Sequence, residues 1–448
     1  MFIHKLFDDL LWSTYFGPEL LLNRNGGLMP KYVAKRIRFR NGERYSVLQA
    51  PYGLPVHEVT VYLDKFRKKG RAANTIHFVC NSLALLYKEL EVAKINLLDR
   101  LATRRFLTIP ELDRLASAAQ YRAEHLEADI QSANTPTVIH IARIGLRRKK
   151  ADKSRKPVDV GTQASRLRYI ADYLEFIANY VGASLPEATR RELEAESSRA
   201  LRAFREHIPE VSARAKLDAR IGLSLKEQEQ LLSVVHPDAP ENPWARGFVR
   251  LRNWLIVVLL LATGMRRGEL LGLQIGDLHS SQPKLRIIRR ADAPEDPRRV
   301  QPNTKTNDRE IELTPSIMKA LWCYINKERR SIKAARAVPQ IIVSDEGKPL
   351  SQASIDKLFS ELRQACPGLP MTLTSHVMRH TWNERFSEQA EAMGLSEGAE
   401  EKARNTQQGW SDNSKMAATY TRRHTAKKGR EISLKLQERL DDKLIRKE

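Results

Sequence analysis

The stretch LATGMRRGELLGLQIGDL, residues 261–278, decides the fold of the second half of the chain. It continues an apolar run, so the sequence predicts a buried helix over residues 248–262. Gly264 is placed to end that helix, because glycine readily adopts the left-handed conformation that closes many helices. The next helix is expected to begin within a few residues. Arg266 would then project from this junction, with Glu269 close enough in sequence to orient its guanidinium.

A second stretch, TSHVMRHTWNERF (residues 374–386), is predicted to form a helix with His376 and Arg379 on one face. Both side chains can donate hydrogen bonds to phosphate oxygens. His380 lies one turn beyond His376, but no acidic residue stands at the spacing of a zinc-binding helix. We therefore interpret His380 as a buried, hydrogen-bonded residue that supports the other two.

A third stretch, QQGWSDNSKMAATYTRR (residues 407–423), contains Trp410 after a glycine and Tyr420 just before a basic run. Each of the three stretches also fits an ordinary structural role when taken alone. These roles are a surface arginine pair at a helix start, a structural helix, and a packing tyrosine. Together and in this order they are much more specific.

The charge of the chain indicates a polyanionic partner. The 448 residues carry a formal net charge of +22, with a pI near 9.9. Such an excess is typical of proteins that bind nucleic acid or an anionic membrane. No basic amphipathic helix with an aromatic face is evident, so double-stranded DNA is favoured, although many basic proteins bind RNA. The basic clusters recur along the chain, at residues 65–71, 143–156, 289–299 and 422–430.

Other features exclude several classes of protein. The longest apolar run, residues 255–262, is far shorter than the roughly 20 residues that cross a bilayer. The N-terminus lacks the pattern of a signal peptide, so we expect a cytoplasmic, nucleoid-associated protein without a membrane partner. The cysteines show no ligand spacing, which predicts neither a disulfide framework nor a zinc site. No phosphate-binding glycine loop is present, and we expect no metal and no cofactor.

The fold class that the pattern predicts is mainly α-helical with a small antiparallel sheet. A capping box at Ser224 and Glu227 marks the start of the second half. A pair of helices is expected over residues 56–92, with a break at 70–74 and with Asn74 or Thr75 capping the second helix. Further helices are expected at residues 109–128, 162–180, 185–215, 315–327, 352–364, 376–390 and 416–420. Strands are expected at residues 44–49, 285–290 and 309–313. The expected domains are residues 1–50 (an extension or arm), 51–215 (a helical region), 222–425 (a helical region with the small sheet) and 426–448 (a terminal helix).

Residues 222–425 resemble the tyrosine recombinase family, which includes phage integrases, transposon integrases and chromosome-dimer resolvases. That family carries an arginine after an ATG-type turn, a lysine in a β-hairpin, an HxxR pair, a His or Trp, and a nucleophilic tyrosine. The matching residues here are Arg266, Lys305 in the stretch NTKTNDREIEL, His376, Arg379, Trp410 and Tyr420, with Glu269 and His380 supporting them. The chain departs from the pattern in a Pro-rich hairpin insertion (ADAPEDPRRVQP), and its Trp410–Tyr420 interval is about one residue longer than usual.

The resemblance implies a site-specific recombinase or integrase of a mobile element that cuts and rejoins DNA without metal or ATP. Tyr420 would attack the scissile phosphate and form a 3′-phosphotyrosyl intermediate. Arg266 and Arg379 would hold the non-bridging oxygens, and Lys305 would protonate the leaving 5′ oxygen. A type IB topoisomerase and a catalytically silent DNA-binding protein are the alternative interpretations.

The resemblance also implies a helical front half that clamps DNA. Its expected phosphate contacts are Lys65, Arg67, Lys68, Lys69 and Arg71, and Arg147, Arg148, Lys149 and Lys150 in a basic connector. The ordinary alternative for each cluster is a solvated helix face. Near the C-terminus an apolar stripe recurs every four residues, at Ile432, Leu436, Leu440 and Leu444. It would pack either on its own domain or on a neighbouring protomer of a DNA-bound homotetramer, alongside any accessory recombination proteins.

Overall fold

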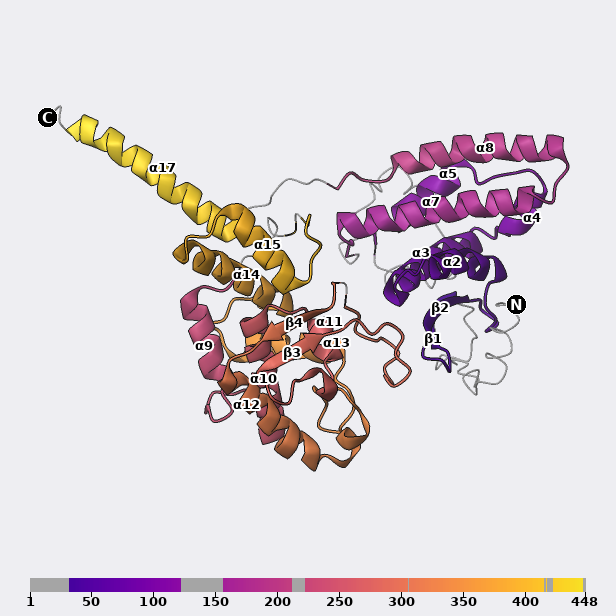
Figure 1. Cartoon of the computed structure of the whole chain (residues 1–448). Coiled ribbons are helices and arrows are strands. Elements are labelled where there is room, and N and C mark those ends of the chain that lie inside the picture. The colour runs from indigo at the N-terminus through magenta and orange to yellow at the C-terminus, as the bar shows by residue number, and fades with distance from the viewer. Residues whose placement is uncertain are drawn as a thin grey trace, which may run out of the picture. The chain divides into compact units, whose positions relative to one another are not determined.

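The computed structural model describes residues 32–121, 156–211, 222–304, 306–414, 416 and 422–445. The chain divides into two compact units, residues 1–214 and 215–448. Both are built mainly of helices, and each contains a two-stranded antiparallel sheet (Figure 1). The predicted fold class, mainly helical with small antiparallel sheet, is confirmed.

In the first unit a hairpin precedes a set of packed helices. Strands β1 (Val33–Arg38) and β2 (Arg44–Gln49) pair in antiparallel fashion, and both contact α3. The helices are α2 (His57–Lys68), α3 (Ala73–Val92), α4 (Leu97–Ala102), α5 (Ile109–Ala118), α7 (Val160–Gly182) and α8 (Glu187–Glu206). The predicted apolar face of α7 is confirmed, because Leu167, Ile170, Leu174 and Ile177 are fully buried.

Three local predictions for the first unit are wrong. Strand β1 was not expected, because the adjacent basic residues Lys35 and Arg36 interrupt the alternation of apolar and polar residues. The N-cap of α3 is Ala72, neither Asn74 nor Thr75; Asn74 instead accepts a hydrogen bond of 2.9 Å from Arg36 Nη1. Helix α5 ends at Ala118 instead of continuing to residue 128, and Tyr121 forms an isolated β-bridge with Pro157.

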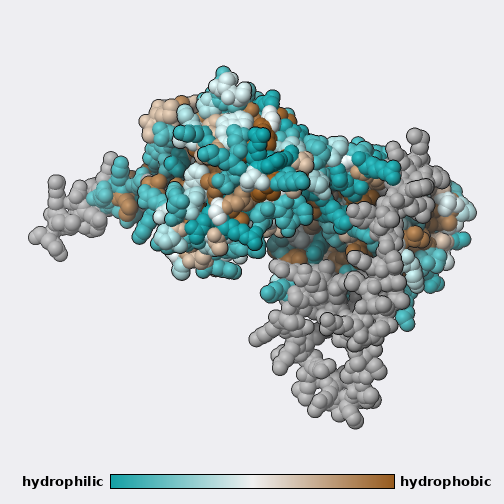
Figure 2. All heavy atoms as spheres, turned by 90° about the horizontal axis from the view of Figure 1, so that it is seen from below, coloured by the Kyte–Doolittle hydropathy of each residue, from teal (hydrophilic) through white to brown (hydrophobic). Residues whose placement is uncertain are grey.

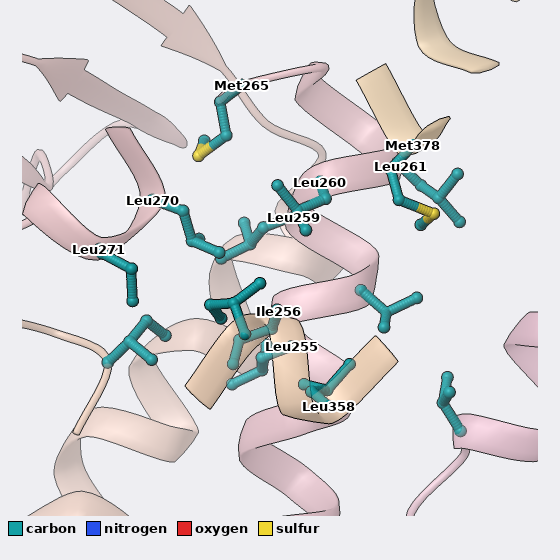
Figure 3. Close-up of a cluster of buried hydrophobic side chains, with 14 of the residues drawn as sticks. Leu255, Ile256, Leu259, Leu260, Leu261, Met265, Leu270, Leu271, Leu358 and Met378 are labelled. Carbon is teal, nitrogen blue, oxygen red and sulfur yellow. The ribbon is translucent and has the colours of Figure 1, made fainter. Parts of the chain in front are cut away.

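The second unit surrounds one long apolar helix, α10 (Gly247–Thr263). The other elements are α9 (Leu225–Val235), α11 (Arg267–Gly272), η2 (Ile275–Asp277), β3 (Lys284–Ile287), β4 (Arg309–Glu312), α12 (Pro315–Cys323), η3 (Tyr324–Arg329), η4 (Lys333–Ala337), α13 (Gln352–Ala365), α14 (Ser375–Ala392), α15 (Glu397–Gln408) and α17 (Arg422–Ile445). Figure 3 shows the core where side chains of α10 and α11 meet Leu358 of α13 and Met378 of α14.

Most predicted elements of the second unit are confirmed, and the differences have local causes. The capping box of Ser224 and Glu227 is present at the start of α9. Strand β3 ends at Ile287, and beyond it the backbone N–H of Arg289 donates to the Asp308 carboxylate (2.7 Å). The helix predicted over residues 315–327 changes to a π-helix after Cys323. The helix predicted over 416–420 lies outside the described residues, apart from Met416.

The described surface is largely polar. Figure 2 shows a face on which hydrophilic residues predominate and hydrophobic ones are scattered. Among the described residues no helix is long and apolar enough to span a bilayer. All three cysteines are free; Cys80 and Cys366 are buried, and Cys323 is exposed.

Gly264 ends α10 in the left-handed conformation, with φ of 62°, as the sequence predicts. A Cβ at this position would lie 2.7 Å from the ring of Trp382, whose Nε1 donates to Ala262 O at 3.0 Å. We expect Gly264→Ala to lower the free energy of unfolding by roughly 2–4 kcal/mol, because backbone strain and steric overlap add. Gly394→Ala is the matched control, since its φ is 69° but nothing lies within 4 Å.

Urea titration of both variants measures this difference. Gly394→Ala should cost only about 1 kcal/mol, which is the backbone strain alone. Equal losses in the two variants would contradict the tight packing of Trp382 on the turn.

Candidate active site

The C-terminal turn of α10 is bonded to side chains from two later helices. A helix leaves its last carbonyl groups without partners inside the helix. Arg379 Nη1, from α14, donates to Gly264 O at 2.7 Å, and Gln408 Nε2, from α15, donates to Thr263 O at 3.3 Å. Both helices are thereby fixed against the turn that leads into Arg266.

Arg266 occupies the N-cap of α11 and is oriented by Glu269, as the sequence predicts. Glu269 accepts a hydrogen bond from the backbone N–H of Arg266 (2.9 Å) and lies 3.3 Å from its Nη1. The side chain of Arg266 is 27% exposed, whereas that of Glu269 is fully buried. The guanidinium therefore has a rigid support on one side and access to solvent on the other.

The same carboxylate also bonds to the β3–β4 hairpin. Thr306 Oγ1 donates to Glu269 Oε1 at 2.7 Å, and Arg309 Nη2 donates to Glu269 Oε2 at 2.8 Å. We call these four residues, Arg266, Glu269, Thr306 and Arg309, the Glu269 cluster. Burial alone raises the pKa of Glu269, but the charge and hydrogen bond of Arg309, the Arg266 N–H and the charge of Arg379 lower it below its usual value. Glu269 is therefore an anion that holds positive groups in place.

Both residues of the HxxR pair, His376 and Arg379, lie on α14. His376 is exposed, and its ring meets the ring of His380 edge to face, with centroids 4.8 Å apart. The predicted burial of His380 is confirmed at 5% exposure. Arg379 is almost fully buried. Among the described residues no group of three or more His, Cys, Asp or Glu side chains is arranged to hold a metal ion.

Trp410 covers Arg379. The guanidinium carbon of Arg379 lies 5.2 Å from the Trp410 ring, within the range of a cation–π contact. Helix α15 ends at Gly409 with φ of 64°, and the N–H of Trp410 donates to Asn405 O at 2.8 Å. The indole is 7% exposed, so at this position the tryptophan packs against the arginine.

The Pro-rich hairpin insertion is an ordered structure that the sequence did not predict. Arg298 is ion-paired with the buried Asp296, and it also donates to Leu350 O (2.8 Å) and Leu271 O (3.1 Å). Arg290 is likewise paired with the buried Asp277. Two arginines of the basic cluster at 289–299 are thus committed to internal ion pairs, which reduces the charge this cluster offers to a polyanion.

Several predicted site residues lie outside the described residues. They are Lys305, Tyr420, Arg147, Arg148, Lys149 and Lys150. Their roles stay predictions. Lys284, the lysine at the start of the hairpin, is ion-paired with Glu310 (3.3 Å) and Glu312 (3.2 Å) of β4.

The basic cluster at residues 65–71 is partly neutralised within its own unit. Arg67 forms a bidentate ion pair with Glu43, in which Arg67 Nη2 lies 2.8 Å from Glu43 Oε2. Lys68 lies 2.8 Å from Asp64. The pair of Arg67 with Glu43 was not predicted, because Glu43 is remote in sequence from the helix that it meets.

The remaining basic residues of that cluster are better placed for an external partner. Lys65 Nζ lies 3.9 Å from the centroid of the Phe176 ring. The pKa of Lys65 is lowered, mainly by desolvation on burial and to a smaller extent by the positive charge of Lys69. Lys69 and Arg71 are exposed. DNA contacts by this cluster stay a prediction, with Lys69 and Arg71 as the stronger candidates.

The match to a known family model covers the second unit. Residues 223–426 match the model described as the phage integrase family. The match spans the Arg266 turn, the hairpin, the HxxR helix and the segment around Trp410 and Tyr420. This part of the chain is thus similar to the phage integrase family.

Individual relatives are distant. Tyrosine recombinase XerD of Halalkalibacterium halodurans is 26% identical over 160 residues, which are 36% of this chain and 46% of the relative. Tyrosine recombinase XerC of a Mycobacterium species (strain KMS) is 27% identical over 131 residues, 29% of this chain and 39% of the relative. The chain thus matches less than half the length of these curated relatives.

The chain is also similar to solved structures of two other recombinases. The Lambda integrase bound to DNA has a TM-score of 0.41 and 13% identity, covering 81% of this chain and 94% of that one. The XerH site-specific recombinase bound to a palindromic difH substrate has a TM-score of 0.38 and 16% identity, covering 74% of this chain and 85% of that one.

Proposed function

We propose that this protein is a site-specific DNA recombinase that cleaves and rejoins DNA strands through a 3′-phosphotyrosyl bond to Tyr420. The observation that carries the proposal is the meeting of Arg266 and Arg379 at one helix end. Arg379 donates to the backbone O of Gly264, which lies two residues before Arg266. The buried Glu269 anion accepts a hydrogen bond from the backbone N–H of Arg266. Two arginines held this way suit the oxygens of a single phosphate.

The proposed reaction conserves the energy of the phosphodiester bond. The Tyr420 oxygen forms a bond to phosphorus, and the bond from phosphorus to the 5′ oxygen breaks. Lys305 gives the proton that the departing 5′ oxygen takes up, and the exposed His376 takes up the proton that the Tyr420 hydroxyl loses. Attack by a 5′ hydroxyl from a second strand reverses these steps. Since the bond energy is kept, the reaction requires no ATP.

Arg379 acts on the phosphate only after a rearrangement. Arg379 is only 1% exposed, and the Trp410 ring lies over its guanidinium. Contact with a phosphate therefore requires that the chain covering Arg379 shifts when DNA binds. Until then Arg379 is held in position by Gly264 O. This arrangement would couple exposure of the full catalytic set to occupation by DNA.

We further propose that DNA is the partner of both units and that the active form is a homotetramer on DNA, at the nucleoid. Ile432 and Leu436 of α17 are 61% and 58% exposed, so the described part of the stripe is not covered by its own chain. Helix α17 contacts α14, where Lys428 is ion-paired with Glu391. An exposed apolar stripe on a solvent-facing helix favours packing on a second protomer.

A plasmid assay tests recombination and assembly together. Two plasmids that carry DNA flanking the gene should give recombinant junctions with the wild-type protein and any accessory proteins of the host extract. Leu436→Glu should lose the junctions but keep binding to one duplex, because only the contact between protomers is disrupted. Gln437→Glu, which adds the same charge beside the stripe, should recombine normally.

Two outcomes would overturn these proposals. Relaxation of any supercoiled plasmid without junction formation would mean that the protein is a topoisomerase. Normal recombination by Leu436→Glu would mean that the stripe does not join protomers.

A further inference from the structure

We propose that Arg309 is a positioning residue that fixes the segment carrying Trp410 against the Arg266 turn. This inference rests on the proposed recombinase function. The Arg309 side chain is 5% exposed and donates in three directions. Nη2 bonds to Glu269 Oε2 (2.8 Å), Nη1 to Thr306 Oγ1 (3.1 Å), and Nε to the backbone O of Gln407 (2.8 Å).

These three acceptors come from three of the four segments that form the site. Glu269 orients Arg266. Thr306 directly follows Lys305 in the sequence. Gln407 belongs to the last turn of α15, just before Trp410. One guanidinium thus bonds to every segment that carries a proposed catalytic residue, except α14.

A second contact joins the hairpin to the end of α15 independently of the Arg309 side chain. The N–H of Asn307 donates to Gly409 O at 2.9 Å. A Cβ at Gly409 would lie 2.8 Å from Asn307 O and 3.0 Å from Arg309 Nη1, and its φ of 64° also favours glycine. The α15 terminus is therefore seated closely on the hairpin, and Arg309 lies at their contact.

The chemistry of arginine suits this role and that of lysine does not. A guanidinium is a planar fork that donates along several fixed directions, whereas an ammonium is a point charge on a flexible stem. A lysine at position 309 would retain the ion pair with Glu269 but could not reproduce the whole set of bonds. Because reactions of this kind depend strongly on the positions of the reacting groups, a looser α15 terminus would slow cleavage. DNA affinity would be unaffected, since Arg309 faces the protein interior.

The test compares Arg309→Gln and Arg309→Lys with Arg286→Gln. Arg286 is the matched control, because it lies on β3 of the same hairpin and donates to a backbone carbonyl, Gly276 O, at 2.8 Å. Three quantities are measured: the single-turnover rate of adduct formation at saturating DNA, the Kd for that DNA, and amide hydrogen exchange over residues 405–414.

We expect Arg309→Gln to lower the adduct rate by about 10- to 100-fold, which is the effect of losing buried charge-assisted hydrogen bonds. The Kd should stay within about twofold of wild type. The amide of Trp410, which bonds to Asn405 O, should exchange faster. Arg309→Lys keeps the charge opposite Glu269, so it should fold normally and recover only part of the rate. Arg286→Gln should match wild type in all three measurements.

The positioning role is wrong if both Arg309 variants form the adduct as fast as Arg286→Gln, or if exchange over residues 405–414 is unchanged in them. The exchange measurement needs no DNA and therefore separates the two proposals. Faster exchange in Arg309→Gln, in a protein whose wild type forms no adduct, would support the link between hairpin and α15 while refuting the recombinase function.

Discussion

Arg379→Lys is expected to lower the rate of DNA cleavage by about 100- to 1,000-fold, the usual effect of removing one donor that stabilises developing negative charge. Lysine keeps the positive charge but loses the fork that bonds to Gly264 O and, in the proposed reaction, to a phosphate oxygen. The affinity for uncleaved DNA should change little, because one buried arginine contributes a small share of many phosphate contacts. The measurement is the single-turnover rate at saturating duplex, with Kd determined separately.

A matched variant separates this effect from general damage to the unit. Arg363, on α13, also donates to a backbone carbonyl, Leu373 O, at 2.6 Å, but is not part of the proposed site. Arg363→Lys should cleave at nearly the wild-type rate. If Arg379→Lys cleaves within about threefold of Arg363→Lys, the proposed role of Arg379 at the phosphate is wrong.

Glu269→Gln is expected to lower the free energy of unfolding of the second unit by roughly 3–5 kcal/mol at neutral pH. The buried carboxylate faces the guanidinium of Arg309 and supports Arg266, so its loss leaves a buried positive charge uncompensated. Glu310→Gln on the same strand is the control. Glu310 is exposed and paired with Lys284, and its replacement should have little effect.

The loss should depend on pH in a defined direction. Burial raises the pKa of Glu269 in the folded protein, but Arg309, the Arg266 N–H and the charge of Arg379 together lower it below its ordinary value. A group of this kind contributes its full stabilisation above its unfolded pKa of about 4.3, and loses it as the pH falls through the lowered folded value. The difference in stability between wild type and Glu269→Gln should therefore be constant from about pH 7 to pH 5 and shrink in stronger acid. A difference that grows on acidification would contradict an ionised Glu269.

Local patterns were sufficient for the parts of the site that lie within one segment. The left-handed Gly264, the support of Arg266 by Glu269 and the shared helix of His376 and Arg379 all follow from spacing and helix geometry. These features depend on residues only a few positions apart, so the sequence order already contains them.

The contacts between segments could not be predicted. Nothing in the sequence pairs Arg309 with Gln407 O, or places Trp410 over Arg379, because those contacts depend on how the end of α15 packs against the hairpin and against α14. The Pro-rich insertion was interpreted as a departure from the family pattern, yet its Arg298 bonds it to Leu271 O of α11. The basic clusters predict a surface for DNA, but two of the ion pairs that neutralise them, Arg67–Glu43 and Arg290–Asp277, involve acids distant in sequence.

The central claim, that Tyr420 is the nucleophile, is tested most directly by covalent trapping on a nicked suicide duplex taken from DNA flanking the gene. Wild-type protein should give a protein–DNA adduct that resists denaturation, and the tyrosine-bearing peptide recovered from it should contain Tyr420. Tyr420→Phe should bind the duplex equally well and give no adduct. An adduct that survives in Tyr420→Phe would contradict the assignment of the nucleophile, and tight binding without any adduct in wild type would contradict the recombinase function.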